Sequence, residues 1–327
     1  MTTPSFARRA VLATGLAALA STFGGMAHAQ TAWPTRPLTF IVAAGAGSSV
    51  DVFARVLAER LQRTLGQSVV VDTRPGGNGV IGTQAVANAK PDGYTFLFAG
   101  NSVLVINPLM TKTLPFNVEK DLVAVAPVVY VPLAIAVRPD HPAKTIQELV
   151  ASSKSNDTFF ATPGSASLSR LIGENINQLG GTRFVNVPYP TGGAAQTDVI
   201  GGRVPVLIDG LGGIAPHAKN ERLRLLAVST QKRAKEFPNV PTIAEAVPGL
   251  VVPGINSLMA PAGTPPAILD QLNAKVREVT ADPAVAERFA GMGGDAAVGT
   301  RADLEALLKA QRVLFRQLID KANIKPD

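Results

Sequence analysis

The sequence predicts an α/β protein built from two similar lobes that are joined by two crossover segments. In the amino-terminal part, three strand–loop–helix units follow one another, which is the pattern of a parallel sheet covered by helices. A second series of such units begins near residue 158. Between the two series lies a long apolar run interrupted by prolines, and another apolar run returns near residue 251. These observations predict the two lobes and the two crossovers.

The first unit contains a glycine-rich turn that leads directly into a helix. Residues 38–43 predict a strand and residues 49–65 an amphipathic helix. Ser48 and Asp51 have the S-x-x-D spacing of a capping box, so we expect the helix to begin near Ser48 or Ser49. The free N–H groups and the dipole of a helix N-terminus attract anions. The turn is therefore a candidate anion site.

The next two units bring further loops of small and polar residues to the same edge of the sheet. Residues 68–72 predict a short, buried parallel strand before the glycine-rich loop 74–79. Residues 94–99 predict a third strand that opens into Asn101 and Ser102. Ligands of such sheets bind beyond the carboxyl ends of the strands. We therefore expect the three loops to converge on one site.

The second lobe repeats the opening arrangement. A strand predicted at 158–161 opens into the loop 162–167, and a helix with one apolar face follows. The apolar run 123–137 is broken by Pro127 and Pro132, so it is too interrupted for a helix and too long for one strand. It suits a crossing between lobes.

The crossovers and the terminal helices set the predicted domain boundaries. We assign residues 30–125 and 259–327 to lobe one, and residues 126–258, with the crossover strands, to lobe two. Three helices are predicted near the carboxyl end, at 265–280, 283–290 and 301–322.

The first 29 residues have the features of an export signal. Arg8 and Arg9 precede an apolar run that ends in the small-residue pattern A-x-A at 27–29, so we expect cleavage after Ala29. A membrane anchor is the alternative, but the run contains three glycines and is short for a span. The paired arginines leave both the general secretory and the twin-arginine routes open.

The composition excludes several classes of function. Removing the signal lowers the formal charge from +7 to +5, clustered basic runs are absent, and only one Trp and three Tyr are available for stacking. We therefore expect no nucleic-acid binding. The absence of cysteine excludes disulfides, thiolate metal sites and a cysteine nucleophile. A mild positive excess suits an anionic small ligand.

The first turn also resembles a dinucleotide-binding fingerprint. Gly45 and Gly47 follow a strand, and Asp72 ends the next strand. Val50, however, occupies the position where a third small residue is needed for close helix–strand packing. An exported protein also lacks free cytosolic NAD, so we expect no cofactor.

An exported serine hydrolase of small esters is the alternative from another class of function. The candidate nucleophiles Ser165 and Ser167 lack the G-x-S-x-G elbow. Beyond the signal, only His141 and His217 are available as imidazole bases, and both lie in polar, surface-like contexts. Without cysteine, two unrelated histidines also argue against a transition-metal site. We therefore expect neither catalysis nor a metal.

Several other polar residues are candidates for ligand contact. Ser165 and Ser167 suit donors at a helix N-terminus, with ordinary capping as the alternative. Asp209 follows an apolar strand and suits a bond to a ligand hydroxyl or amine, with a cap or an interdomain contact as the alternative. Arg74 and Arg170 are the nearest cations for a second carboxylate.

A series of short motifs occurs in order along the chain beyond the signal. They include W-P-x-R-P at 33–37, R-P-G at 74–76, P-D-G-Y at 91–94, V-P-Y at 187–189 and A-P-A-G-T-P at 260–265. Together they resemble the Bug-type extracytoplasmic solute receptors of tripartite tricarboxylate transporters. The ordered matches span essentially the whole mature chain.

The resemblance implies a periplasmic binding protein of a type II-like, two-lobed fold. Such a receptor closes on a small mono- or dicarboxylate, aromatic ones included, and delivers it to the membrane subunits of the transporter. A receptor that feeds a sensor kinase is a further alternative, and we expect a monomer. In the family, backbone N–H groups and small hydroxyls of the first strand–helix loop hold the carboxylate, and loops of the second lobe lie opposite. The residues that we expect to bind the ligand are Gly45, Ala46, Gly47, Ser48, Ser49, Asp51, Asn101, Ser102, Gly164, Ser165, Ser167, Tyr189 and Asp209.

The sequence departs from the family pattern where ligand identity or lobe closure is set. The first loop keeps its aspartate but has Ser48 where glycine is usual. Pro190 and Pro205 stand in place of a usual lysine and aspartate, and Ile255 and Asn256 replace an aromatic pair. The ligand of a relative therefore cannot be transferred to this chain.

Overall fold

The computed structural model describes residues 33–326, and the elements discussed below belong to the unit that begins at Arg36. The predicted export signal and its cleavage after Ala29 lie outside the described residues. Within residues 33–326, no helix has both the length and the apolar character needed to cross a membrane.

A six-stranded mixed sheet forms the first layer of the fold, which we call lobe one together with its helices. Its strand order is β11-β4-β10-β3-β1-β2. The strands are β1 (Leu38–Val42), β2 (Val69–Thr73), β3 (Thr95–Gly100), β4 (Leu122–Val131), β10 (Gly254–Pro261) and β11 (Asp295–Ala296). β1 pairs in parallel with both β2 and β3, as the three amino-terminal units predict. β10 inserts antiparallel between β3 and β4.

A five-stranded mixed sheet forms lobe two. Its order is β7-β6-β8-β5-β9. The strands are β5 (Leu133–Val137), β6 (Thr158–Pro163), β7 (Phe184–Tyr189), β8 (Val206–Gly210) and β9 (Arg224–Val228). β6 pairs in parallel with β7 and β8, whereas β5 runs antiparallel to β8 and β9. The predicted α/β class is confirmed, with both sheets mixed.

The chain changes sheet at two prolines. β4 ends at Val131 and β5 begins at Leu133, so Pro132 separates two strands of different sheets. The return occurs just before Gly254, where β10 begins after Pro253. The crossover strands β4 and β10 are hydrogen-bonded within the sheet of lobe one. We propose the sheet changes as the physical boundaries of the two lobes.

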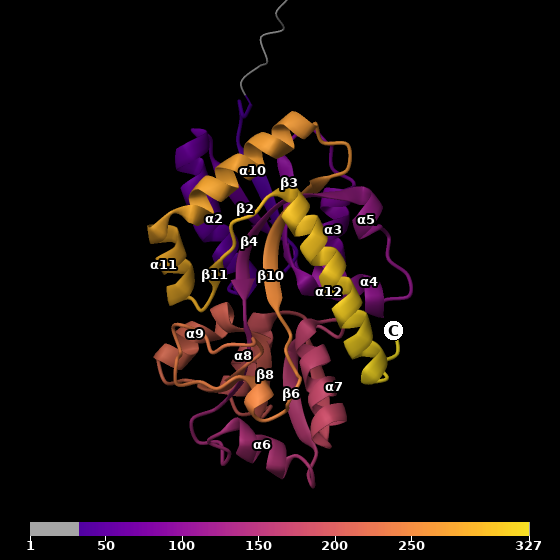
Figure 1. Cartoon of the computed structure of the whole chain (residues 1–327), viewed down its shortest axis with the longest axis vertical. Helices are drawn as coiled ribbons and strands as arrows, with labels where there is room; N and C mark the ends of the chain where they lie inside the picture. The colour runs from indigo at the N-terminus through magenta and orange to yellow at the C-terminus, as the bar shows by residue number, and fades with distance from the viewer. Residues whose placement is uncertain (1–32, 327) are drawn as a thin grey trace, which may run out of the picture. The chain divides into compact units, whose positions relative to one another are not determined.

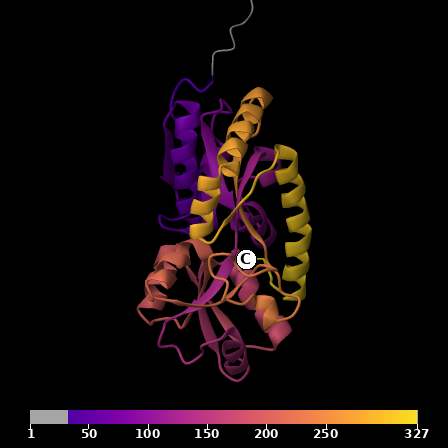
Figure 2. The same cartoon turned by 60° about the vertical axis from the view of Figure 1, so that its left-hand side comes forward.

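Helices cover both sheets. The main ones are α2 (Ser49–Leu65), α3 (Val80–Ala87), α6 (Ile146–Ser152), α7 (Leu168–Gly180), α8 (Gly192–Ile200), α9 (Leu211–Lys219), α10 (Pro266–Ala281), α11 (Pro283–Gly291) and α12 (Arg301–Lys321). The remaining helical segments are short. They are η1 (Gly77–Gly79), the π-helical η2 (Ser102–Ile106), α4 (Asn107–Met110), α5 (Val118–Asp121) and η3 (Ile243–Glu245). α10 packs against α2 and α11, while α12 contacts α10 through the ion pair between Arg301 and Asp270 and then runs along η2 and α7 (Figures 1 and 2). The three predicted carboxyl-terminal helices are confirmed.

α2 is anchored by an apolar face that the sequence pattern predicts. Phe53, Leu57 and Leu61 are fully buried, and burying each contributes about 2 kcal/mol. The ring of Phe53 meets Phe289 of α11 edge to face, with centroids 5.3 Å apart. Gly66 ends the helix in the left-handed conformation. This packing fixes where the N-terminus of α2 points.

One local prediction was wrong, and one helix was not predicted. The strand predicted at 68–72 is parallel, but β2 lies at the edge of its sheet and Val70 is 51% exposed. The helix that was not predicted is α9, which contains Gly212, Gly213 and Pro216. These residues disfavour a helix, yet the two glycines let α9 approach α2 closely, since a Cβ at Gly212 would lie 2.6 Å from the Phe53 ring.

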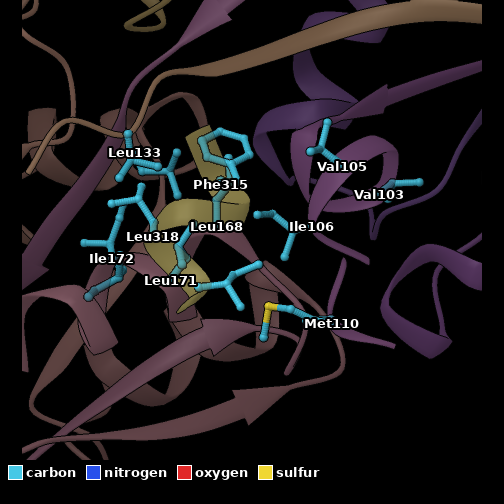
Figure 3. Packing of buried hydrophobic residues seen from close by; sticks show 14 of the residues in the cluster. Val103, Val105, Ile106, Met110, Leu133, Leu168, Leu171, Ile172, Phe315 and Leu318 are labelled. Carbon is cyan, nitrogen blue, oxygen red and sulfur yellow. The ribbon is translucent and has the colours of Figure 1, made fainter. Parts of the chain in front are cut away.

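One apolar cluster extends from lobe one to lobe two. Leu168, Leu171 and Ile172 of α7 pack beside Phe315 and Leu318 of α12 (Figure 3). The Nδ2 of Asn175 in α7 also donates to the carbonyl of Leu318, at 3.3 Å. The last helix of the chain therefore belongs by sequence to lobe one but also packs against lobe two.

Candidate functional site

A cavity of about 430 Å³ lies where strands of both sheets end. This volume is within the range of small-molecule sites. Five strands, β1, β3, β6, β7 and β8, contribute residues at their carboxyl ends to its wall. These residues are Ala43, Gly100, Pro163, Tyr189 and Gly210. The position agrees with the rule for parallel sheets that predicted it.

The side chain of Asp51 stabilises the turn before α2. Ser48 caps the helix, because its Oγ accepts from the backbone N–H of Asp51 at 3.3 Å. Asp51 Oδ2 in turn accepts from the N–H of Gly47 at 2.9 Å, and its Oδ1 pairs with Arg55 Nε at 2.9 Å. Neither Asp51 nor Gly47 lines the cavity. The aspartate therefore holds the shape of the turn.

Two backbone N–H donors of α2 remain available at the cavity. The first four N–H groups of a helix, counted from its N-cap, have no acceptor within the helix, and here that of Ser48 donates to the carbonyl of Gly45 at 3.2 Å. That of Asp51 is capped by Ser48, which leaves those of Ser49 and Val50. Both residues line the cavity.

The N-terminus of α8 faces the same turn from lobe two. Thr191 caps α8 through its Oγ1, which accepts from the N–H of Ala194 at 3.2 Å, and Thr191 and Gly192 line the cavity. The approach to lobe one is close, because a Cβ at Gly45 would lie 2.7 Å from Thr191 Cγ2. Two helix N-termini from different lobes thus meet at the cavity.

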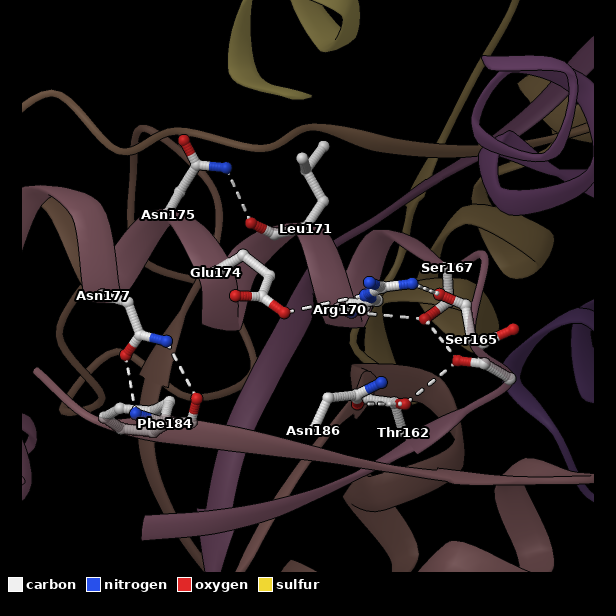
Figure 4. Close-up of polar contacts among 11 residues, drawn as sticks. Thr162, Ser165, Ser167, Arg170, Leu171, Glu174, Asn175, Asn177, Phe184 and Asn186 are labelled. Atoms are coloured by element: carbon white, nitrogen blue, oxygen red, sulfur yellow. Dashed lines mark hydrogen bonds and ion pairs between the residues drawn. The ribbon is translucent and has the colours of Figure 1, made fainter. Parts of the chain in front are cut away.

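Protein groups accept two of the three first-turn N–H groups of α7 and leave that of Ser169, which lines the cavity. Ser167 caps it, with Oγ accepting from Arg170 N–H at 3.2 Å and donating to the carbonyl of Gly164 at 3.1 Å (Figure 4). The N–H of Leu168 donates to Ser102 Oγ, at 3.1 Å, across the two lobes. Capping, the alternative weighed for Ser167, is what the structure shows for its hydroxyl.

A second contact between the lobes joins Asn78 to Ser165. Asn78 Nδ2 donates to Ser165 Oγ, and Ser165 N–H donates to Asn78 Oδ1, both at 3.1 Å. Gly164 has a φ of 93°, and a Cβ there would lie 2.3 Å from Asn78 Oδ1. The glycine therefore permits the approach. The loop 163–167 presents its polar groups mainly to lobe one.

The side chain of Asn101 is also engaged by the protein. Its Oδ1 accepts from the backbone N–H of Ile255 at 2.6 Å, and its Nδ2 donates to Gln311 Oε1 at 2.5 Å. Gln311 continues the chain of bonds to the carbonyl of Pro253. This buried network links β3, β10 and α12 at the cavity wall.

Asp209 is a buried acid at the cavity wall. Its Oδ1 accepts from its neighbour's backbone N–H at 2.7 Å, and its Oδ2 accepts from Gln196 Nε2 at 3.1 Å. Burial raises its pKa to about 6, although both hydrogen bonds act in the opposite direction. Tyr189 lies nearby in the lining and donates its hydroxyl to Asp198 at 2.9 Å. The pKa of Tyr189 is raised, first by burial and then by this bond.

The structure brings most of the predicted site residues to one cavity. Those that line it are Gly45, Ser48, Ser49, Asn101, Ser102, Gly164, Ser165, Tyr189 and Asp209. Those that do not line it are Ala46, Gly47, Asp51 and Ser167. Ligand contact by any of them stays a prediction.

The two candidate cations point elsewhere. Arg74 pairs with Asp72 at 2.8 Å, and Arg170 pairs with Glu174 at 3.6 Å. Neither arginine lines the cavity. A second carboxylate in the cavity would therefore not meet either of them in this arrangement.

Sequence reasoning did not select several residues that line the cavity. Asn78, Thr191, Gly192 and Asn256 are examples. A signal was present for Thr191, since a threonine before two glycines and a helix is a capping pattern. Asn256 was marked only as a departure from the family pattern, because its position depends on pairing between β10 and β3.

The elements of a serine hydrolase are not assembled around Ser165. Its hydroxyl bonds to Asn78, and neither described histidine lines the cavity. His141 Nδ1 accepts from the N–H of Ala143 at 3.1 Å, in a surface turn. His217 is half-buried, and burial lowers its pKa.

Residues 33–326 contain no cluster of acidic or imidazole groups suited to a metal ion.

Two α/β lobes around one cavity define a two-lobed solute-binding protein. Residues 53–324 match the family of tripartite tricarboxylate transporter receptors, and the chain belongs to this family. A UPF0065 protein of Bordetella bronchiseptica is 65% identical over 92% of this chain and 89% of its own length. Protein BugT of Bordetella pertussis is 36% identical over 82% of this chain and 83% of its own.

Solved structures agree with this family. Rpa4515 of Rhodopseudomonas palustris, solved with adipate, has a TM-score of 0.88 at 29% identity, covering 90% of this chain and all of that one. The periplasmic binding protein BugD has a TM-score of 0.85 at 30% identity, with 90% and 99% covered. MatC of Rhodopseudomonas palustris, solved with malate, has a TM-score of 0.82 at 25% identity, with 88% and 100% covered. The family and these neighbours are binding receptors.

Proposed function

We propose that this chain is a periplasmic receptor that binds a small carboxylate between its lobes and delivers it to the membrane subunits of a tripartite transporter. One observation carries the proposal. The N-termini of α2 and α8, from different lobes, meet at one cavity with unpaired first-turn donors. Such donors and their dipoles favour a carboxylate without any chemical step.

The contacts between the lobes support closure on the ligand. The pairs Asn78–Ser165 and Ser102–Leu168 form only when the lobes are together, and Gly45 packs directly against Thr191. Opening by a hinge at the two sheet changes would break these contacts and expose the cavity. In this proposal the lining residues bind the ligand, while Asp51 and Ser167 shape the turns that do so.

The relatives support the class of ligand. Rpa4515 was solved with adipate and MatC with malate, both small carboxylates. We further propose export with cleavage after Ala29 and a monomeric receptor, whose two lobes divide at the sheet changes at Pro132 and Pro253. Binding without catalysis is part of the proposal, since Ser165 has no base among its partners.

Binding of carboxylates by the mature chain tests the proposal. A panel of mono- and dicarboxylates should contain compounds that raise the melting temperature and bind saturably in calorimetry. Ser48→Leu should abolish that binding, because a leucine would crowd the donors of α2, and it should cost only about 1 kcal/mol of stability through the lost cap. The matched control is Ser155→Leu, the same change at an exposed position that does not line the cavity.

Two results would contradict the proposal. Unchanged affinity in Ser48→Leu would refute the placement of the site, and turnover of the ligand without retention would favour the hydrolase.

Deleting the gene separates transport from signalling. Loss of uptake of the bound carboxylate supports the transporter, whereas intact uptake with lost induction supports a sensor kinase.

A further inference from the structure

The cavity wall holds two polar groups that the protein leaves without partners. Of the buried side-chain atoms that lack a hydrogen-bond partner within residues 33–326, two belong to lining residues: Ser49 Oγ and Asn256 Nδ2. Ser49 is 6% exposed and Asn256 is 5% exposed. Buried polar groups are normally paired, because leaving one unpaired is costly. Both atoms therefore lie unpaired at the cavity wall, and a ligand that reaches them would supply the missing partner.

The charge of the wall restricts what that ligand carries. Among the described lining residues, none is lysine, arginine or histidine, and Asp209 is the one with a carboxyl group. One carboxylate can rely on the N-termini of α2 and α8. A second carboxylate would be buried without a cation, in a wall that already contains an acid, which is unfavourable on both counts.

Asn256 nevertheless offers a donor for a second group. Its side chain lies on β10 against Gly100 of β3, where a Cβ on Gly100 would be 2.7 Å from Asn256 Oδ1. The free Nδ2 calls for an oxygen acceptor. An uncharged hydroxyl, carbonyl or ether oxygen satisfies it without burying another charge.

The sheet order sets how far apart the two ligand groups lie. β1, which leads into the turn before α2, and β10, which carries Asn256, flank β3 on opposite sides. Two strand spacings separate them, about 10 Å, and hydrogen bonds of about 3 Å at each end leave at least roughly 4 Å between the ligand's oxygen groups. The acceptor therefore lies beyond the carbon adjacent to the carboxylate.

We propose that the receptor selects a monocarboxylate that carries an uncharged oxygen acceptor at a distance from the carboxylate, and that Asn256 Nδ2 recognises this acceptor. The inference rests on the proposed function, because it assigns the carboxylate to the end of α2. It makes Asn256, a departure from the family pattern, the residue that sets specificity.

A matched series of ligands tests the inference on the wild-type mature chain by calorimetry. Hexanoate, 6-hydroxyhexanoate and adipate differ only in the distal group, and 2-hydroxyhexanoate moves the hydroxyl next to the carboxylate. The same series is repeated with chains of four to eight carbons. At the best-binding length, the distal hydroxyl should tighten binding about two- to tenfold over the plain acid. The dicarboxylate should bind more weakly than the distal hydroxy acid, and the 2-hydroxy acid should gain nothing.

Variants then assign the effect to one residue. Asn256→Leu keeps the size of the side chain and should erase the advantage of the distal hydroxyl while leaving the plain acid bound. Asn256→Ser serves the same purpose if the leucine variant is poorly folded. The matched control is Ser257→Ala, next on the strand, whose Oγ is also buried and unpaired but does not line the cavity. It should bind as the wild type does.

The outcomes separate this inference from the proposed function. A dicarboxylate that binds as tightly as the distal hydroxy acid would overturn the inference and leave carboxylate binding intact. An advantage of the hydroxyl that survives in Asn256→Leu and Asn256→Ser would overturn the role of Asn256. No saturable binding of any carboxylate in the series or the wider panel would overturn the proposed function itself.

Discussion

A single methyl group at Gly45 should oppose closure of the lobes. In the closed arrangement, the new Cβ would lie 2.7 Å from Thr191 Cγ2 and 2.9 Å from Thr191 Cβ. Carbon atoms in favourable contact are about 3.5–4.0 Å apart, so the overlap is close to 1 Å. Gly45 is not among the glycines with positive φ, so its backbone accepts alanine. The strain therefore falls on the contact between lobes.

The expected effect is a loss of affinity without a loss of fold. Overpacking of this kind costs about 1–3 kcal/mol. Because the cost applies only to the closed state, it lowers the population that is competent to bind, and affinity should fall about 5- to 150-fold. Calorimetry with a carboxylate that the wild type binds measures this for Gly45→Ala. The melting temperature without ligand should change little, since open lobes relieve the overlap.

Two further variants make the test specific. Gly193→Ala adds the same methyl group on α8, where the nearest atom in the structure is the carbonyl oxygen of Ala46 at 3.8 Å, so affinity should stay close to that of the wild type. Adding Thr191→Ser to Gly45→Ala removes the clashing Cγ2 but keeps the capping hydroxyl, and it should restore part of the affinity. Wild-type affinity in Gly45→Ala, or an equal fall in melting temperature with and without ligand, would refute the closure argument.

Two predictions concern stability. Asp209 has a folded pKa of about 6, above its unfolded value of about 3.9. Its contribution to folding stability is therefore fully present below about pH 4 and is lost as the pH rises towards 6. The free energy of unfolding falls by roughly 3 kcal/mol over this range. Asp209→Asn should therefore gain stability over the wild type as the pH rises from 4 to 7 in urea titrations, and a difference that does not change with pH would count against this. Asn101→Ala leaves Gln311 Oε1 and the N–H of Ile255 buried without their partner and should cost roughly 2–6 kcal/mol. Asn156→Ala, at an exposed asparagine, is the control, and similar urea midpoints for both variants would contradict the role of the buried network.

Local signals in the sequence determined much of the first lobe. The capping pair Ser48–Asp51, the apolar spacing of α2 and Gly66 at its end act within a few residues of one another, so they specify the helix without knowledge of the fold. The strand–loop–helix repeats likewise predicted parallel pairing of β1, β2 and β3, and the order of motifs predicted the family. Each of these features depends on chemistry that is short in sequence.

The tertiary structure alone decided what the loops do. Asn78 and Ser165 are 87 residues apart in the chain, and Asn101 and Ile255 are 154 apart, so no local pattern predicts their bonds. The insertion of β10 between β3 and β4 brings Asn256 to the cavity, and the packing of α8 against the first turn brings Thr191 there. The sequence determined which turns offer donors, whereas long-range strand pairing and lobe contact determined which donors the protein uses itself and which it leaves for a ligand.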